Sequence, residues 1–197
     1  MARFTLPPAD EVRARLLRAA RDEFAASGLV GGRIERIAAA SGSNKAQLFH
    51  YFGGKEGLFD AVLAQELDGM LDEVPFDAED LPGYAGRLHD AALQRPWVER
   101  LTTWRRLERT SSEPIEVLAR AAADTVAEVE RAQRAGVLPR TMRPAVLLAL
   151  VLHLATTWQA TSPEFDPLVA AVTPARRRQT VVDAVAALLV GSVRAPR

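Results

Sequence analysis

Proline residues divide this chain into a series of helix-length segments, and their spacing strongly limits the fold that the chain can adopt. Helix-forming stretches follow Pro8, Pro82, Pro96, Pro114, Pro144 and Pro174. Proline is tolerated in the first turn of a helix, because its missing N–H would have no intrahelical partner there. Alternating, β-branched runs bounded by turns are absent from the sequence. The sequence therefore predicts an all-α fold with about nine helices.

The expected helices follow the spacing of apolar residues and the positions of glycine. They span about residues 8–27, 34–40, 44–51, 55–73, 82–95, 97–110, 114–135, 144–161 and 174–193, and residues 162–173 are expected to form a loop. The first helix has one apolar stripe, made of Val12, Leu16, Leu17, Ala20 and Phe24. Gly28 suits the position just after that helix, where a left-handed backbone is common.

Composition excludes several classes of functional site. The 197 residues include no cysteine, which rules out thiolate catalysis and Cys-based metal sites, and three histidines, at positions 50, 89 and 153. The sequence has no glycine-rich phosphate loop, no Ser-centred nucleophile elbow and no His-x-x-x-His pair. It therefore predicts a protein that is not an enzyme and that has no cofactor and no metal site.

The sequence also lacks the patterns of secretion and membrane insertion. Residues 1–8 contain no apolar signal-peptide core. The longest apolar run, residues 144–152, is far shorter than the roughly 20 residues that a membrane-spanning helix needs. We therefore expect a cytoplasmic protein with no membrane partner.

Charge is balanced over the whole chain but unevenly distributed. The 25 basic and 25 acidic residues give a net charge of zero, yet residues 1–57 carry a net charge of +3 and the rest carries −3. No acidic residue lies between Arg36 and Lys55, although Arg36, Lys45 and Lys55 are basic. Because DNA-binding surfaces are typically basic, this acid-free segment is the first candidate for a nucleic-acid contact.

Residues 33–59 have the layout of a helix-turn-helix, with two short helices joined through residues 41–43. In the second helix Leu48 and Phe52 lie one turn apart and are expected to face inward. The side chains left facing outward are then Asn44, Lys45, Gln47 and Phe49. Such residue types suit base edges, thymine methyl groups and phosphates.

Residues 9–65 resemble the tetracycline-repressor (TetR) family of bacterial transcriptional regulators. The signature consists of Ile34-x-x-Ile37-Ala38-x-x-Ser41-Gly42, followed by Lys45-x-x-Leu48-Phe49-His50-Tyr51-Phe52-x-x-Lys55-Glu56-x-Leu58. The resemblance implies an all-helical homodimer with an N-terminal DNA-binding domain, residues 1–54, and a C-terminal ligand-binding and dimerisation domain, residues 55–197, connected by helix 55–73. It also implies a repressor that binds a palindromic operator in double-stranded DNA and is released by a small molecule, whose identity the sequence does not give.

The same resemblance assigns roles within the motif. Positions that usually meet phosphates are matched by Lys45, Phe49, His50, Tyr51 and Lys55, and positions that usually face bases by Asn44, Ala46 and Gln47. Ser43, where the family often has a small apolar residue, is included as a further contact. Gly32-Arg33 replaces the usual Thr or Ser before the first helix of the motif, so Arg33 is expected to supply the phosphate contact there. Gly53-Gly54 replaces a Pro-Ser or similar pair, which leaves helix 55–73 without a side-chain cap.

The C-terminal part gives only candidates. Lining of a ligand pocket is predicted for His89, Trp97, Trp104, Glu108, His153 and Trp158, with the alternative that each is a core or interface residue. For the dimer interface the candidates are the apolar helix 144–161 and the last helix, with Val181, Val185, Leu188 and Leu189 on one face. The alternative is that both helices serve only their own subunit's core.

Two rival functions remain at this point. One is a ligand-independent architectural DNA-binding protein, against which the roughly 140 residues beyond the motif argue, since binding alone does not need them. The other is an enzyme, for which no nucleophile–base pair or phosphate loop is present in the sequence.

Overall fold

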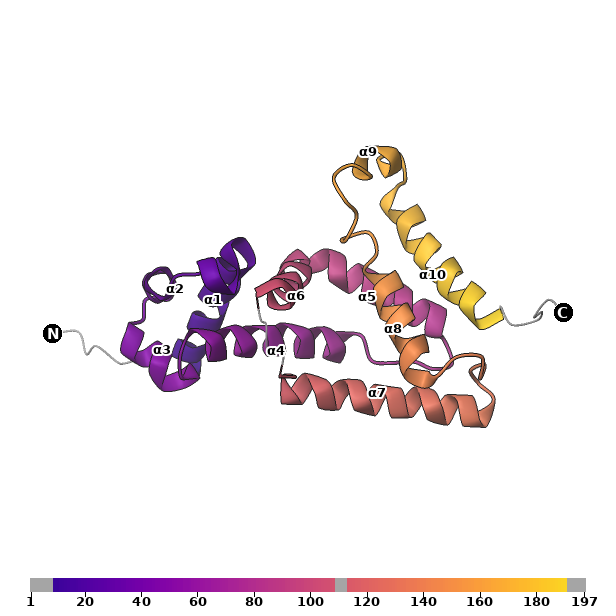
Figure 1. The fold of residues 1–197 in the computed structure, drawn as a ribbon, viewed down its shortest axis with the longest axis horizontal. Helices are drawn as coiled ribbons and strands as arrows, with labels where there is room; N and C mark the ends of the chain where they lie inside the picture. Colours follow the sequence, from indigo (N-terminus) through magenta and orange to yellow (C-terminus); the bar gives the residue numbers. More distant parts are fainter. Residues whose placement is uncertain (1–8, 109–112, 191–197) are drawn as a thin grey trace. The chain divides into compact units, whose positions relative to one another are not determined.

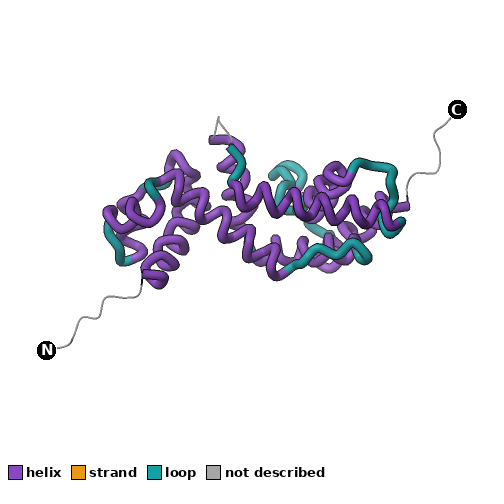
Figure 2. The backbone as a smooth tube through the Cα atoms, turned by 90° about the horizontal axis from the view of Figure 1, so that it is seen from below, coloured by secondary structure: helices purple, strands orange, loops and turns teal. Residues whose placement is uncertain are grey.

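The computed structural model describes residues 9–108 and 113–190, and within them every regular element is a helix (Figures 1 and 2). The helices are α1 (Ala9–Gly31), α2 (Ile34–Ser41), α3 (Lys45–Phe52), α4 (Lys55–Glu73), α5 (Leu81–Gln94), α6 (Pro96–Glu108), α7 (Glu116–Ala135), α8 (Pro144–Ala155), α9 (Asp166–Val169) and α10 (Pro174–Val190). The predicted all-α fold is confirmed.

The chain forms two compact units. Unit 1 comprises the chain up to Leu67 together with Arg100–Ile115, and unit 2 comprises Asp68–Glu99 together with the chain from Glu116 onward. Helices α4 and α6 therefore each contribute residues to both units. The predicted boundary between residues 54 and 55 differs from this division, because the first two-thirds of α4 belong with the N-terminal helices.

Unit 1 is organised around the apolar stripe of α1. All five predicted stripe residues are buried, and the Phe24 ring meets the Phe59 ring of α4 edge to face, with 5.2 Å between ring centroids. Ile37 of α2 and Leu48 of α3 are fully buried. Helix α2 packs on α1, and α3 packs on α2. Helices as short as these two are not stable alone, so their burial in unit 1 is what stabilises them.

Unit 2 has a separate apolar core between α5, α7, α8 and α10. Its fully buried side chains include Val129 of α7, Leu147 and Val151 of α8, and Val185 of α10. Helix α10 packs along α5 and also contacts α8. Part of the surface of α8 is left apolar and exposed.

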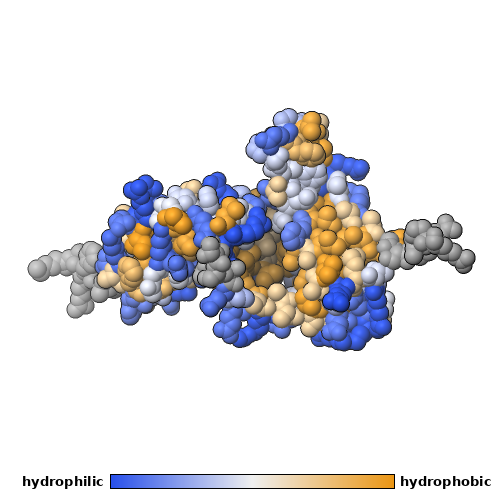
Figure 3. Space-filling model, in the orientation of Figure 1, coloured by the Kyte–Doolittle hydropathy of each residue, from blue (hydrophilic) through white to orange (hydrophobic). Residues whose placement is uncertain are grey.

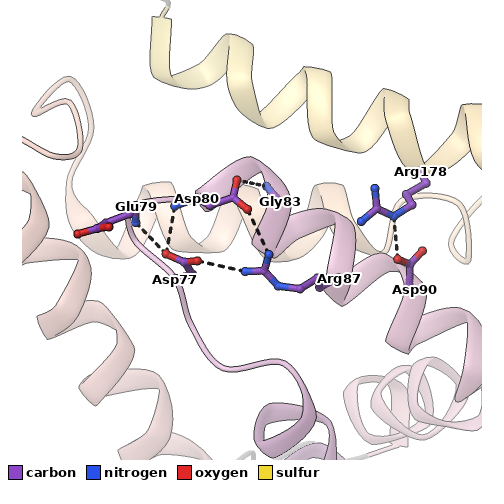
Figure 4. A network of polar contacts seen from close by, with 7 residues as sticks. All are labelled: Asp77, Glu79, Asp80, Gly83, Arg87, Asp90 and Arg178. Atoms are coloured by element: carbon purple, nitrogen blue, oxygen red, sulfur yellow. Dashed lines mark hydrogen bonds and ion pairs between the residues drawn. The ribbon is translucent and has the colours of Figure 1, made fainter.

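Polar contacts fix the beginning of α5 and join this helix to α10 (Figure 4). Asp80 caps α5 by accepting from the Gly83 N–H at 2.9 Å, and Arg87, in the second turn of the helix, donates to Asp80 and Asp77. Arg178 of α10 donates to the Asp90 carboxylate at 2.7 Å. Capping of this kind satisfies backbone N–H groups that have no intrahelical partner.

Most helix limits agree with the sequence prediction to within two residues. The first helix is one exception, because α1 continues past the break at Gly28 to Gly31, four residues beyond the predicted end. The apolar helix 144–161 is another, because α8 ends at Ala155. Thr156 Oγ1 there donates to the Leu152 carbonyl, and Trp158 Nε1 donates to the Arg177 carbonyl of α10. The predicted loop 162–173 contains the short helix α9. The predicted ends at residues 110 and 193 lie outside the described residues.

No helix of the described residues is both long and apolar enough to cross a membrane.

The turn between α2 and α3 contains a buried hydroxyl. Gly42 has a left-handed backbone, with φ of 62°, and its N–H and the Ser43 N–H donate to the carbonyls of Ala39 and Ala38. The Ser43 side-chain oxygen is buried and has no hydrogen-bond partner among the described residues. Burial without a partner costs free energy, because the hydroxyl loses its hydrogen bonds to water.

We therefore expect Ser43→Ala to raise the free energy of unfolding by about 1 kcal/mol, since it removes that unsatisfied hydroxyl and retains the backbone bonds. Thermal or urea unfolding would measure the change. Ser27→Ala, at a half-buried position of α1, is a suitable comparison. A loss of stability in Ser43→Ala would show that the hydroxyl has a partner after all.

Candidate nucleic-acid interface

Helix α3 begins with a capping box formed by two of the predicted DNA-binding residues. The Gln47 N–H donates to Asn44 Oδ1 at 2.9 Å, and the Asn44 N–H donates to Gln47 Oε1 at 3.2 Å. The two side chains therefore satisfy backbone groups at the start of the helix. Gln47 keeps its amide N–H groups for an external acceptor, while Asn44 Oδ1 is already engaged.

The outward face of α3 is formed by the residues that the sequence predicted. Exposed side chains there are Asn44, Lys45, Ala46, Phe49 and His50. Phe49 is 50% exposed, which is unusual for a large apolar ring and suits contact with a thymine methyl group or a sugar. Leu48, on the opposite face, is fully buried, so the orientation of α3 is set by its own core contact.

The end of α3 is aromatic. His50 is exposed, and its ring lies edge to face against the half-buried Tyr51 ring at 5.3 Å between centroids. The Arg13 guanidinium of α1 lies 5.6 Å from the centre of the Phe52 ring. Gly53 then ends the helix with a left-handed backbone, φ of 71°. The predicted inward position of Phe52 agrees with its half-buried side chain.

Lys45 has an intramolecular partner that the sequence analysis did not identify. Its Nζ lies 2.5 Å from Glu35 Oε1 of α2, and both side chains are more than half exposed. The hydrogen bond from Lys45 lowers the pKa of the Glu35 carboxyl below its usual value. Glu35 directly precedes the acid-free segment, so its carboxylate competes with phosphate for the Lys45 ammonium.

Lys55 also has a partner within unit 1. Its Nζ donates to the Val30 carbonyl at the end of α1, at 2.8 Å. An ammonium group has three donors, so a phosphate at the beginning of α4 remains compatible with this bond. The free N–H groups of that helix terminus favour an anion in any case.

Arg33 takes the N-cap position of α2 and makes no side-chain cap. Its backbone N–H donates to Glu23 Oε1 of α1 at 3.0 Å, which holds the N-cap residue on α1 but does not cap the first N–H groups inside α2. The Arg33 side chain is exposed and therefore accessible to a phosphate. Ser43 differs from its prediction as a DNA contact, because its hydroxyl is buried in the turn.

The predicted ligand residues are divided between the two units. Glu108 and Trp104 belong to unit 1, and Glu108 Oε2 accepts from the backbone N–H groups of Leu29 and Val30. His153 is exposed on α8 with Nδ1 2.7 Å from the Ala149 carbonyl. Trp97 is half-buried.

Two of the predicted ligand residues pack in the core region of unit 2. His89 is fully buried, with Nδ1 3.1 Å from the Ala155 carbonyl and with Nε2 lacking a partner among the described residues. Trp158 is half-buried, and the Arg177 guanidinium lies 5.1 Å from its ring. Gln159, which the sequence analysis missed, has both amide atoms buried without a partner in the described chain.

Two of the predicted dimer-interface residues are core residues instead. Val181 and Val185 are 2% and 0% exposed, because α10 turns them toward α5 and α8 of its own unit. They cannot contact a second chain in this conformation. Leu188 and Leu189 are half-buried, and Leu189 packs against the same core.

No group of three or more His, Cys, Asp or Glu side chains within residues 9–108 and 113–190 is arranged to hold a metal ion.

Comparison with known proteins gives one consistent result for both halves of the chain. Residues 16–62 match the domain "Bacterial regulatory proteins, tetR family", and residues 80–186 match "Tetracyclin repressor-like, C-terminal domain". The HTH-type transcriptional repressor SCO4008 of Streptomyces coelicolor is 33% identical over 157 residues, which cover 79% of this chain and 81% of that protein. The repressor NicS of Pseudomonas putida is 46% identical over 55 residues, 28% of this chain and 26% of its own.

Solved structures agree with these matches. The crystal structure of SCO4942 from Streptomyces coelicolor has a TM-score of 0.79 and 36% identity, and the match covers 90% of this chain and 97% of that one. Salmonella enterica GusR, at 21% identity and a TM-score of 0.68 over 96% of this chain and 100% of its own, supports the fold alone. Through both domain matches, and through its likeness to SCO4008 over most of each chain, this chain belongs to the TetR family of bacterial regulatory proteins.

Proposed function

We propose that this DNA-binding transcriptional regulator is a repressor that binds a palindromic operator as a homodimer and is released by a small molecule. The observation that supports it most strongly is the exposed outer face of α3, which combines amide, ammonium and aromatic groups in a segment without acidic residues. A recognition helix needs such groups for base edges and phosphates. The named repressors among its relatives support the sign of regulation.

Dimerisation is supported by an exposed apolar face on α8. Val146, Leu150 and Leu152 are 48%, 39% and 39% exposed, whereas Leu147 and Val151 on the other face are fully buried. Figure 3 shows apolar surface gathered over α8 in unit 2. A face of this kind is usual at a homodimer interface, where a two-fold axis brings the same helix of two chains together. Leu188 of α10 stays in the proposed interface, and Val181 and Val185 do not.

Ligand binding in unit 2 is supported by the buried polar atoms without partners. His89 Nδ1 lies against a carbonyl and therefore carries the proton, which leaves Nε2 as an acceptor. Gln159 lies four residues after Ala155, the residue whose carbonyl His89 contacts, and its amide offers both a donor and an acceptor. Buried polar groups are normally hydrogen-bonded. We therefore propose a ligand with at least one N–H or O–H group directed at His89 Nε2.

DNA binding is tested by the two residues of the surface ion pair. Lys45→Ala should weaken binding to all duplexes and reduce the slope of log affinity against log salt by about 1, because one phosphate contact is lost. Glu35→Gln should strengthen binding to all duplexes, because it frees Lys45 and removes a negative charge. Arg120→Ala on α7 of unit 2 is the control for loss of one exposed positive charge. Fluorescence anisotropy at several salt concentrations measures all three.

Sequence preference is tested separately at Gln47. Gln47→Glu retains the acceptor for the Asn44 N–H, and so the capping box, but loses the amide donor. We expect the preference for the operator over random duplex to fall by about 1–3 kcal/mol. The proposed function is wrong if the wild-type protein shows no preference for DNA upstream of its own gene over random duplex at moderate salt.

The dimer is tested by a charge on the exposed face of α8. Leu150→Glu should raise the dimer dissociation constant by about 100-fold or more, because two carboxylates would be buried without partners across the axis. Val117→Glu, at a 49% exposed position of α7, is the matched control. Sedimentation velocity at micromolar concentration gives the result. A dimeric Leu150→Glu variant, or a monomeric wild type, would refute this interface.

The ligand site is tested with the two unpartnered groups. Gln159→Leu should raise the free energy of unfolding of the ligand-free protein by about 1–3 kcal/mol, because two buried polar atoms are removed. A compound that stabilises the wild type and releases it from operator DNA should have no such effect on Gln159→Leu or His89→Leu. Gln179→Leu, whose amide is exposed on α10, is the control. A metabolite screen without effect on either signal counts against the proposal, as does a full response in both variants.

A further inference from the structure

Helix α1 is interrupted one turn before its end, and the backbone groups freed there have unusual partners. Gly28 has φ of 73° and ψ of −178°, which breaks the helical path. The N–H groups of Leu29 and Val30 donate to the Glu108 carboxylate, with N to Oε2 distances of 2.5 and 3.1 Å. Glu108 is the last residue of α6 and lies 79 residues from Leu29 in the chain. A single acidic side chain therefore satisfies both amides after the break.

The same peptide segment is held from its carbonyl side. Lys55, at the start of α4, donates to the Val30 carbonyl at 2.8 Å. The residues Leu29 and Val30 are thus fixed by an acid from α6 and a base from α4, all within unit 1. Charge-assisted bonds of this kind are shorter and stronger than bonds between neutral groups.

The two glycines at the ends of this segment lie in close contact with their neighbours. A Cβ atom on Gly28 would lie 2.6 Å from Glu108 Oε1, and one on Gly32 would lie 2.7 Å from the Phe24 ring. The Gly32 N–H donates to the Gly28 carbonyl at 3.1 Å. A side chain at either glycine would therefore collide with these neighbours, and the Glu108 carboxylate lies directly against Gly28.

The position of Glu108 on its own helix is unfavourable. An acidic side chain at a helix C-terminus opposes the helix dipole, which favours the basic residues Arg105 and Arg106 in that turn. The two bonds to α1 give the carboxylate its stabilising partners.

The fixed segment leads directly into the helix-turn-helix. Arg33, the N-cap of α2, follows Gly32, and α2 is followed by the turn and α3. Helix α6 is continuous from Pro96, and its residues before Arg100 belong to unit 2. Glu108 thus links the start of the helix-turn-helix to the end of α6.

We propose that Glu108 is a positioning residue for DNA recognition: by binding the Leu29 and Val30 amides, it fixes the start of the helix-turn-helix and couples it to α6. This rests on the proposed function, since it assigns Glu108 a part in operator binding rather than in lining a ligand pocket. It predicts that loss of the carboxylate reduces recognition of the operator without removing any phosphate contact.

The test compares Glu108→Ala and Glu108→Gln with the control Glu116→Gln, an exposed acid of α7 that pairs with Arg120. In Glu108→Ala, amide hydrogen exchange at Leu29 and Val30 should accelerate at least about tenfold, because a charge-assisted bond is lost. In Glu108→Gln the exchange should accelerate less, because the side-chain amide oxygen can still accept hydrogen bonds from the Leu29 and Val30 N–H groups. The ratio of operator to random-duplex affinity should fall by about tenfold in Glu108→Ala, with the salt slope unchanged.

Gly28→Ala provides a second perturbation while Glu108 remains, because its Cβ would meet the carboxylate and the φ of 73° is strained for alanine. Like Glu108→Ala, it should accelerate amide exchange at Leu29 and Val30 and lower the ratio of operator to random-duplex affinity. Wild-type exchange rates at Leu29 and Val30 in Glu108→Ala would overturn the proposal, and so would faster exchange with an unchanged affinity ratio. If the wild type has no operator preference, both the proposed function and the positioning role in DNA recognition are wrong. The exchange rates would still show whether Glu108 fixes the segment.

Discussion

The burial of one apolar stripe on α1 is the constraint on which the DNA-facing surface depends. Phe24 of α1 packs against Phe59 of α4. Both rings are fully buried, as are Ile37 of α2 and Leu48 of α3. Helices of eight residues, such as α2 and α3, are too short to be stable by themselves. Their orientation is therefore set by the few side chains that they bury, and the polar face of α3 is what remains outside.

Much of unit 1 could be predicted because its determinants are local. Glycine positions gave the breaks at residues 28, 42 and 53, and the spacing of apolar residues gave the buried face of each helix. The outer face of α3 could be predicted from the residues that remain once Leu48 and Phe52 are assigned to the inner face. The buried hydroxyl of Ser43 and the ion pair between Lys45 and Glu35 were missed, because both depend on the angle between α2 and α3 rather than on spacing along one helix.

In unit 2 the sequence showed which helices are apolar but not what covers them. Val181 and Val185 form a regular stripe that suits an interface as well as it suits a core, and only the packing of α10 on α5 decides between them. The polar partners of Glu108 are equally hidden in the sequence, because Leu29 lies 79 residues away. The early end of α8 is equally hidden, because Trp158 just after it donates to the Arg177 carbonyl of α10, a partner 19 residues away.

The capping box at the start of α3 has a consequence for how operator preference can change during divergence. Asn44 and Gln47 each serve the helix and the proposed DNA contact, so most replacements there would weaken α3 before altering what it reads. The side chains of Ala46 and Phe49 are exposed and have no group that could form a hydrogen bond within the fold. In related regulators with this capping box, substitutions at these two positions can therefore change operator preference with the least loss of helix stability. The capping pair limits the range of operator sequences that such substitutions can reach.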